Sequence, residues 1–180
     1  MSYTTIKAVW PGDKAEDLRE LRNSFGSAPV VWNEIAKRYL GLRDYEYSFR
    51  SDELWPLYKR HDVPAHQRAV LMMTYDNALV LKSNYKQAAA DIRAFLADFP
   101  QRDGYANHWP EIAALFDSDP ECPAIGFHMT SVSEDPFQGP YNDDTEDYDQ
   151  PDWSVYWDAY AEAEKWKAPN AGYTPKCPIT

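Results

Sequence analysis

Cysteine and glycine are both scarce in this sequence. Its 180 residues include two cysteines, Cys122 and Cys177, and seven glycines. Two cysteines do not make the disulfide framework that stabilises small secreted domains, so we expect reduced thiols. Seven glycines leave few places where the backbone could approach a phosphate group closely. The sequence therefore weighs against a disulfide-rich secreted protein and against a glycine-rich nucleotide-binding loop.

Long apolar runs are absent as well. No stretch approaches the roughly 18 consecutive apolar residues that a membrane-spanning helix needs. The first ten residues, MSYTTIKAVW, lack the charged start and the apolar run of a signal peptide. We therefore expect a cytoplasmic protein that does not enter a membrane.

The motifs of the common catalytic and cofactor sites are missing too. The sequence contains no GxSxG, HExxH, Walker or GxGxxG segment, each of which would indicate a particular chemistry. The stretch that begins at Asn142 lacks the alternating acids and the glycine of an EF-hand loop. The four histidines do not have the spacing of zinc ligands. We expect no cofactor and no specific metal site, and we favour a binding protein over an enzyme.

One long segment has no positively charged residue. Between Glu134 and Glu164 there are eleven acidic residues and neither lysine nor arginine. The whole chain has 29 acidic and 18 basic residues, so the 18 acids outside this segment balance the 18 bases. The net charge of −11 therefore resides in this segment. Because nucleic acids and anionic lipids attract cations, we expect neither to bind the protein directly.

Aromatic residues are frequent in and beside the same segment. Charges steer an encounter over long range, and tyrosine and tryptophan bury much area at short range with few rotors to freeze. Together they predict a surface that binds a basic protein. The residues that we predict to bind this partner are Tyr141, Asp143, Asp144, Glu146, Asp147, Tyr148, Asp149, Trp153 and Trp157.

The part of this segment from residue 133 to 151 reads as an acidic aromatic loop. It has three prolines and neither helical nor strand periodicity. Loops longer than about 12–15 residues without secondary structure are usually functional or disordered. A solvated connection without a function is therefore an alternative to a binding surface.

A C-terminal helix is predicted after this loop, with Asp152 as its N-cap. A stripe of apolar, mostly aromatic residues at helical spacing follows, and it either packs on the sheet as core or remains exposed as a docking face. Its members are Trp153, Tyr156, Trp157, Tyr160 and Ala163.

The remaining patterns predict an α+β fold: a mostly antiparallel sheet of about four to five strands with helices packed on it. Alternating or apolar runs favour strands at residues 4–10, 43–50, 69–75, 78–81 and 124–132. Helical spacing with caps favours helices at 13–25, 27–40, 51–58, 83–99 and 108–116. A single helix over 64–73 is the alternative to the strand at 69–75.

We expect three parts in the chain. Residues 1–132 form the α+β core, and residues 133–151 form the acidic aromatic loop. Residues 152–180 form a C-terminal helix and tail that pack on or beside the same domain.

The leading functional hypothesis is a non-catalytic interaction protein that binds, and so inhibits, a basic or nucleic-acid-binding partner protein. Immunity proteins and inhibitors of restriction or other defence systems use this physical logic, which is an analogy of charge and not of fold. The alternative is a small enzyme with His128, which lies within the predicted strand at 124–132, as acid or base in a cleft between the sheet and a helix. The sequence leaves the oligomeric state open.

Overall fold

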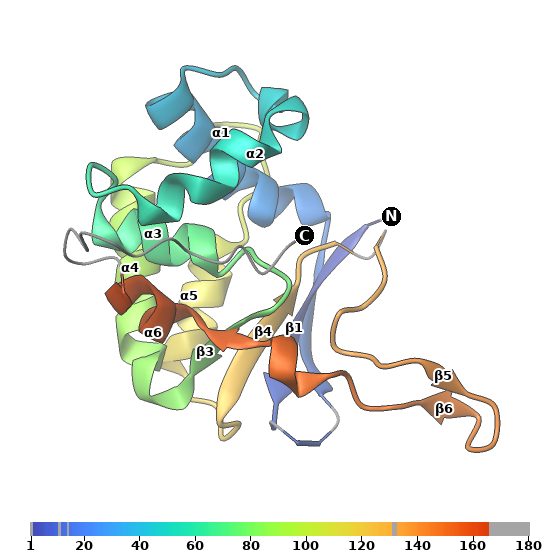
Figure 1. The fold of residues 1–180 in the computed structure, drawn as a ribbon. Coiled ribbons are helices and arrows are strands. Elements are labelled where there is room, and N and C mark those ends of the chain that lie inside the picture. The colour runs from blue at the N-terminus through green and yellow to red at the C-terminus, as the bar shows by residue number, and fades with distance from the viewer. Residues whose placement is uncertain (1, 11, 14, 131–132, 166–180) are drawn as a thin grey trace.

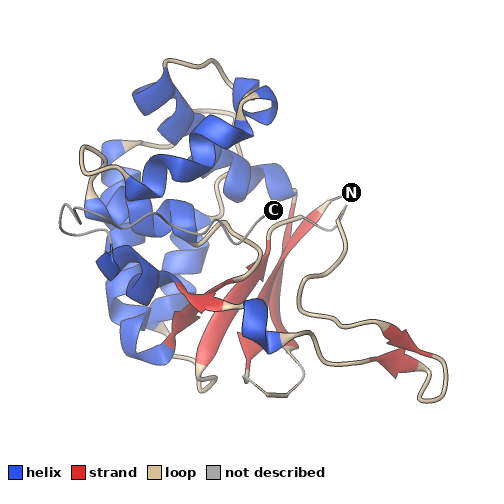
Figure 2. Cartoon of the chain, in the orientation of Figure 1, coloured by secondary structure: helices blue, strands red, loops and turns tan. Residues whose placement is uncertain are grey.

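A five-stranded sheet divides the protein into two unequal layers, with most of the helices on one side (Figures 1 and 2). The computed structural model describes residues 2–10, 12–13, 15–130 and 133–165. Within these residues it contains six α-helices, a five-stranded mixed sheet and a two-stranded sheet, which confirms the predicted α+β class.

The large sheet has the strand order β2-β1-β4-β3-β7. Neighbouring strands are antiparallel except at the edge, where β3 and β7 run parallel. The sheet is therefore mostly antiparallel, as predicted. Its strands are β1 (Tyr3–Val9), β2 (Glu16–Arg22), β3 (Ala78–Leu81), β4 (Ala124–His128) and β7 (Trp157–Asp158).

The helical layer covers one face of this sheet and encloses the main core. Ile6, Val80 and Phe127 point from the sheet into this core and are buried. No helix of the described residues is long and apolar enough to cross a membrane. The α-helices are α1 (Ala28–Leu40), α2 (Ser51–Leu54), α3 (Ala65–Met72), α4 (Tyr85–Asp98), α5 (Trp109–Asp117) and α6 (Ala159–Lys165). Short 3-10 helices are η1 (Ser24–Gly26), η2 (Glu46–Phe49), η3 (Trp55–Lys59), η4 (Lys82–Asn84) and η5 (Trp153–Val155).

The opposite face of the sheet, which we call the second face, carries a smaller apolar cluster. Val9, Leu79 and Ala124 project from three strands, and Phe137 packs on them from the segment after β4. The ring of Phe137 lies directly over Gly126, where a Cβ atom would come within 2.2 Å of the ring carbon Cζ. This glycine therefore makes room for the start of the acidic segment to pack flat on the sheet.

The predictions for α1, α4, α5, β1, β3 and β4 are confirmed, apart from their ends. Helix α1 ends where Gly41 adopts a left-handed conformation with φ of 67°, which is the usual role of glycine at a helix C-terminus. The predicted strand at 124–132 is shorter than expected, because β4 ends at His128; residues 131 and 132 lie outside the described part.

The helix predicted at 13–25 is wrong, because residues 16–22 form strand β2. This strand pairs with β1 from Tyr3↔Arg22 to Ala8↔Glu16, so the backbone groups of β1 find partners on this side of the strand. A single capping pattern is a weak local signal, and the gain from extending the sheet outweighs it.

Two predicted strands in the middle of the chain are also wrong. Residues 43–50 form a turn followed by η2, and only Tyr47 of the alternating aromatic residues is buried. Residues 69–75 belong largely to α3, so the alternative of one helix over 64–73 is correct. Every residue of α3 from Gln67 to Met72 is buried, and a helix enclosed in this way shows no apolar stripe in its sequence.

The single helix predicted after Asp152 is replaced by η5, β7 and the shorter α6. The backbone N–H of Trp157 donates a hydrogen bond to the carbonyl oxygen of Asn77 at 3.1 Å, and Ala78 pairs with Trp157 in the sheet. Residues 157–158 therefore pair with the open edge of β3 as a short strand, although the aromatic residues after Asp152 repeat at helical spacing. The predicted tail at 166–180 lies outside the described residues.

The contact between Gly126 and Phe137 can be tested by stability. We expect Gly126→Ala to lower the free energy of unfolding by about 1–3 kcal/mol, the usual cost of overpacking a core. Urea unfolding measures this change. In a Phe137→Ala background the same substitution should cost much less, because the ring that it meets is gone. Equal costs in the two backgrounds would show that Phe137 does not cover Gly126.

Candidate functional site

The acidic segment forms a hairpin that extends away from the helical layer (Figure 1). We call residues 139–150 the acidic arm. Within it, β5 (Tyr141–Asn142) pairs antiparallel with β6 (Asp147–Tyr148). Two further backbone hydrogen bonds continue the ladder toward the body: Gly139 N–H to the Asp149 oxygen and Asp149 N–H to the Pro140 oxygen, both 2.9 Å. The predicted loop at 133–151 therefore has regular structure that its sequence did not reveal.

The tip of the acidic arm is held by local hydrogen bonds. The Asn142 side-chain oxygen accepts a bond from the backbone N–H of Asp144 at 3.0 Å, and its amide nitrogen donates to Asp149 Oδ1 at 3.2 Å. Glu146 has a positive φ of 53°, which closes the turn. These contacts fix the direction of the turn without using a basic residue.

The carboxylates of the acidic arm face solvent. Residues 143–149 are all exposed, and five of these seven residues are acidic. Several acids elsewhere in the described chain are paired with lysine or arginine, as in Glu53 with Arg50 and Asp44 with Arg102. Asp143, Asp144, Glu146 and Asp149 take part in none of the ion pairs among the described residues. The negative charge predicted for this segment thus remains available at the surface.

Two of the predicted aromatic anchors lie on the acidic arm and are exposed. Tyr141 and Tyr148 are directly opposite each other on β5 and β6, and 54% and 44% of their surfaces are accessible. Their ring centroids are 5.3 Å apart in an edge-to-face arrangement. Cross-strand aromatic pairs of this kind stabilise a hairpin, so the two rings both hold the arm together and present apolar surface.

The other two predicted anchors point toward the body of the protein. Trp153 is half-buried and packs with Tyr156 against the apolar cluster on the second face of the sheet. Trp157 is also half-buried and packs against the main core. The nine predicted partner-binding residues are therefore divided, with seven on the arm and two at its base.

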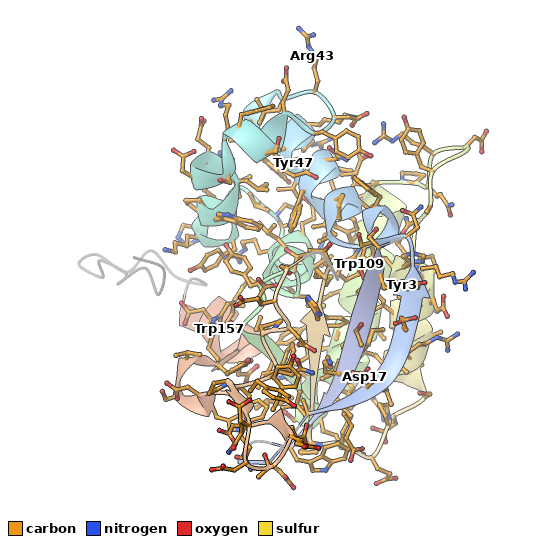
Figure 3. All side chains as sticks on the ribbon, turned by 90° about the vertical axis from the view of Figure 1, so that its right-hand side faces the viewer. Tyr3, Asp17, Arg43, Tyr47, Trp109 and Trp157 are labelled. Atoms are coloured by element: carbon orange, nitrogen blue, oxygen red, sulfur yellow. The ribbon has the colours of Figure 1, made fainter. Side chains whose placement is uncertain are left out.

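The base of the acidic arm is tied to the sheet by a buried ion pair. Lys7 projects from β1 onto the second face, and 6% of its side chain is exposed. Its Nζ atom donates to Asp135 Oδ2 at 2.5 Å and to Asp17 Oδ1 at 2.6 Å. Asp17 is largely exposed on β2 (Figure 3), whereas 14% of the Asp135 side chain is accessible. Asp135 is thus the buried partner, and it precedes the acidic arm by only a few residues.

The electrostatic balance at Lys7 favours its charged form. Burial acts to lower the pKa of the ammonium group, but the hydrogen bonds and charges of Asp135 and Asp17 outweigh this effect and raise the pKa above its ordinary value. A group with a raised folded-state pKa contributes stability that is complete below the unfolded-state pKa of about 10.4. That contribution is lost as the pH rises through the folded-state pKa.

A tyrosine adds a second attachment at the base. The hydroxyl of Tyr156 donates to the backbone oxygen of Pro136, and the Tyr156 ring packs 5.4 Å from that of Phe137. Burial raises the pKa of Tyr156 to about 12, so the hydroxyl remains a donor at neutral pH. The segment before the arm is therefore fixed by an ion pair, a ring contact and a hydrogen bond.

His128, the predicted acid or base, lies at the end of β4 on the second face, on the side of the sheet away from the main core. Its Nε2 atom is 3.2 Å from Ser133 Oγ, and its Nδ1 atom is 3.9 Å from Asp135 Oδ1. The Ser133 hydroxyl donates to the backbone oxygen of Thr130 at 3.0 Å. Serine, histidine and aspartate are the residue types of a hydrolase triad. However, the 3.9 Å between His128 and Asp135 is longer than a hydrogen bond, and Lys7 already binds the Asp135 carboxylate.

A second feature, which the sequence analysis missed, is a cavity of about 570 Å³ beside the base of the arm. Five aromatic residues line it, and Asp76 is the one charged residue among the described residues that line it. We call it the aromatic pocket. Its lining includes Trp32, Trp55, Tyr75, Asp76, Tyr156 and Trp157. These residues come from α1, η3, the turn before β3 and the chain before α6, so no local pattern could have joined them.

Asp76 is exposed at this cavity and lies in the turn between α3 and β3. The walls around its carboxyl group remove water and raise its pKa above the ordinary value, while the nearby His128 acts in the opposite direction. No ion pair joins it to a lysine or arginine in the part of the chain that the structure describes.

No group of three or more histidine, cysteine, aspartate or glutamate side chains among the described residues is placed to hold a metal ion.

The chain matches no protein-family model, no curated protein and no solved structure.

The role of Asp135 at the base of the arm can be tested against that of Asp17. We expect Asp135→Asn to reduce the free energy of unfolding at pH 7 by about 3 kcal/mol, because it deprives a buried ammonium of its buried partner. Asp17→Asn removes the same charge from the same lysine at an exposed position and should cost at most about 1 kcal/mol. Urea unfolding at pH 7 compares the two variants. Equal costs would contradict the assignment of Asp135 as the anchor.

Proposed function

We propose that this protein is a non-catalytic interaction protein that binds a basic surface of a partner protein with its acidic arm. The observation that carries this proposal is the outward position of five exposed carboxylates, of which at least four form no ion pair within the described chain. A partner that brings cations to this hairpin relieves the repulsion among like charges.

The charge of the acidic arm acts first on the rate of encounter. An exposed ion pair contributes only about 0–1 kcal/mol to affinity. Summed over many charges, however, electrostatic steering raises association rates by about 10–10³ at low ionic strength. We therefore expect the acids to control how fast the partner arrives and how strongly salt weakens binding.

The two tyrosines supply the short-range part of the proposed interface. Tyr141 and Tyr148 flank the acidic turn and already contact each other before a partner binds. Tyrosine is favoured at interfaces because it buries a large area and freezes few rotors. In this proposal the rings slow dissociation, whereas the acids speed association.

The most suitable partner is a protein whose basic groove normally holds nucleic acid. A ridge of carboxylates spaced along a hairpin can occupy such a groove in place of phosphates, and so inhibit the partner. We propose a cytoplasmic setting for this interaction, which is compatible with the buried free thiol of Cys122.

A second candidate function is a small enzyme that uses His128. The observation in its favour is the 3.2 Å distance from His128 Nε2 to Ser133 Oγ, with Asp135 beyond the other ring nitrogen. Such a site lies on the second face of the sheet and not in the cleft beneath the helices. This candidate requires His128, and it does not require the acids at the tip of the arm.

The arm proposal is tested by neutralising its five acids at Asp143, Asp144, Glu146, Asp147 and Asp149 to the matching amides. This variant removes five negative charges from a net charge of −11. In a pull-down from a native lysate at low salt, we expect the wild-type protein to capture a basic partner that rising salt elutes. The arm variant should lose that partner.

The matched control neutralises five exposed acids elsewhere, and it should retain capture. With the purified partner, the arm variant should slow association, whereas Tyr141→Ala should mainly speed dissociation. If the arm variant keeps full biological activity and His128→Ala abolishes it, the binding function is wrong and the enzyme is favoured. The acids of the control variant are Glu16, Glu20, Asp52, Asp103 and Glu121.

A further inference from the structure

The aromatic pocket contains a continuous row of rings. Neighbouring centroids are 5.3 Å apart for Trp32 and Trp55, 4.9 Å for Trp55 and Tyr75, and 5.6 Å for Tyr75 and Trp157. The planes meet at 88°, 59° and 72°, so the rings face the cavity in different directions. Trp157, which is labelled in Figure 3, is the last of these four rings along the row. Rings at large mutual angles form the walls of a box and not a flat platform.

Hydrogen bonds hold these rings in place. The Trp32 indole N–H donates to Thr74 Oγ1 at 2.8 Å, and the Tyr75 hydroxyl donates to the backbone oxygen of Trp55 at 2.9 Å. The backbone of Trp157 is fixed by its pairing with β3. A ligand therefore meets walls that are already in position, which lowers the cost of binding.

The charge at this cavity has one sign. Asp76 is the only ionisable acid or base among the described lining residues apart from tyrosine, and no lysine or arginine of the described chain forms an ion pair with it. The negative faces of aromatic rings attract cations, with tryptophan the most effective. The aromatic rings and the Asp76 carboxylate therefore both favour a cationic ligand. The net charge of −11 also attracts cations to the protein as a whole.

The size of the cavity indicates how large this ligand is. Small-molecule sites commonly enclose about 300–1,000 Å³, and the aromatic pocket measures about 570 Å³. An ammonium head group occupies only part of that volume. The remainder is lined by Met129, Val155 and polar groups from Thr130 and Ser154, which suit an organic body of mixed polarity.

We propose that the aromatic pocket binds an organic cation through its alkylammonium group, which lies among Trp32, Trp55, Tyr75 and Trp157 with Asp76 as counter-ion. This site is separate from the tip of the acidic arm and does not depend on the function proposed for the arm. A neutral ligand such as a sugar, for which stacking on tryptophan is also favourable, is the competing occupant, and charge distinguishes the two.

The probe is choline, and its matched control is neohexanol, which has the same shape with carbon in place of the charged nitrogen. Calorimetric titration and the fluorescence of the pocket tryptophans report binding to the whole protein. We expect choline to bind at least about tenfold more tightly than neohexanol, a difference equivalent to about 1.4 kcal/mol. Equal affinity for the two probes, or no binding of choline, would overturn the proposal.

Substitutions locate the site. Asp76→Asn should weaken choline binding about tenfold or more, equivalent to about 1.4 kcal/mol, and should leave neohexanol unaffected. Trp157→Phe keeps a ring and should weaken choline less than Asp76→Asn does. Asp143→Asn removes the same charge from the arm and should not change choline affinity, whereas an equal loss in this variant would mean that only the overall field attracts the cation, contrary to the proposal.

Two further comparisons separate this proposal from others. A short peptide with trimethyl-lysine that binds far more tightly than choline would place the ammonium group on a protein chain. Similar affinities of the peptide and choline would indicate a small molecule. Either result supports an ammonium ligand.

The five-acid arm variant should bind choline normally, and Asp76→Asn should still capture the partner of the arm. Failure of one proposal is therefore visible without failure of the other.

Discussion

The contact between the buried ammonium of Lys7 and the carboxylate of Asp135 determines where the acidic segment leaves the body of the protein. A charged group on a central strand requires a partner once it is buried, and the chain supplies that partner just before the acidic arm. The same contact brings Phe137 over Gly126 and the hydroxyl of Tyr156 to the Pro136 oxygen. One interaction thus covers the second face of the sheet and directs the hairpin outward.

This attachment divides the aromatic residues of the acidic segment between two tasks. Beyond the anchor, Tyr141 and Tyr148 are exposed on a hairpin with carboxylates around them. After the hairpin, Trp157 returns to the sheet edge and completes the row of rings around the aromatic pocket. The two surfaces that we propose for cationic ligands are therefore separate, one polyanionic on the hairpin and the other lined by aromatic rings.

Features that depend on neighbouring residues were the ones that the sequence could predict. The apolar stripe of α4 and the exposed acids at 143–149 both follow from short spacings in the sequence. Pairing between distant strands could not be read in this way, so β2 and β7 were taken for helices. The aromatic pocket was missed for the same reason, because Trp32 and Trp157 are brought together only by the completed fold.

Amide hydrogen exchange at the base of the arm tests most directly whether the Lys7–Asp135 contact holds the hairpin. We expect measurable protection of the Gly139 and Asp149 amides in the wild-type protein. In Asp135→Asn this protection should fall, while the amides that join β1 to β4 remain protected. Unchanged protection at Gly139 and Asp149 in that variant, or no protection in the wild type, would show that the Lys7–Asp135 contact does not hold the hairpin.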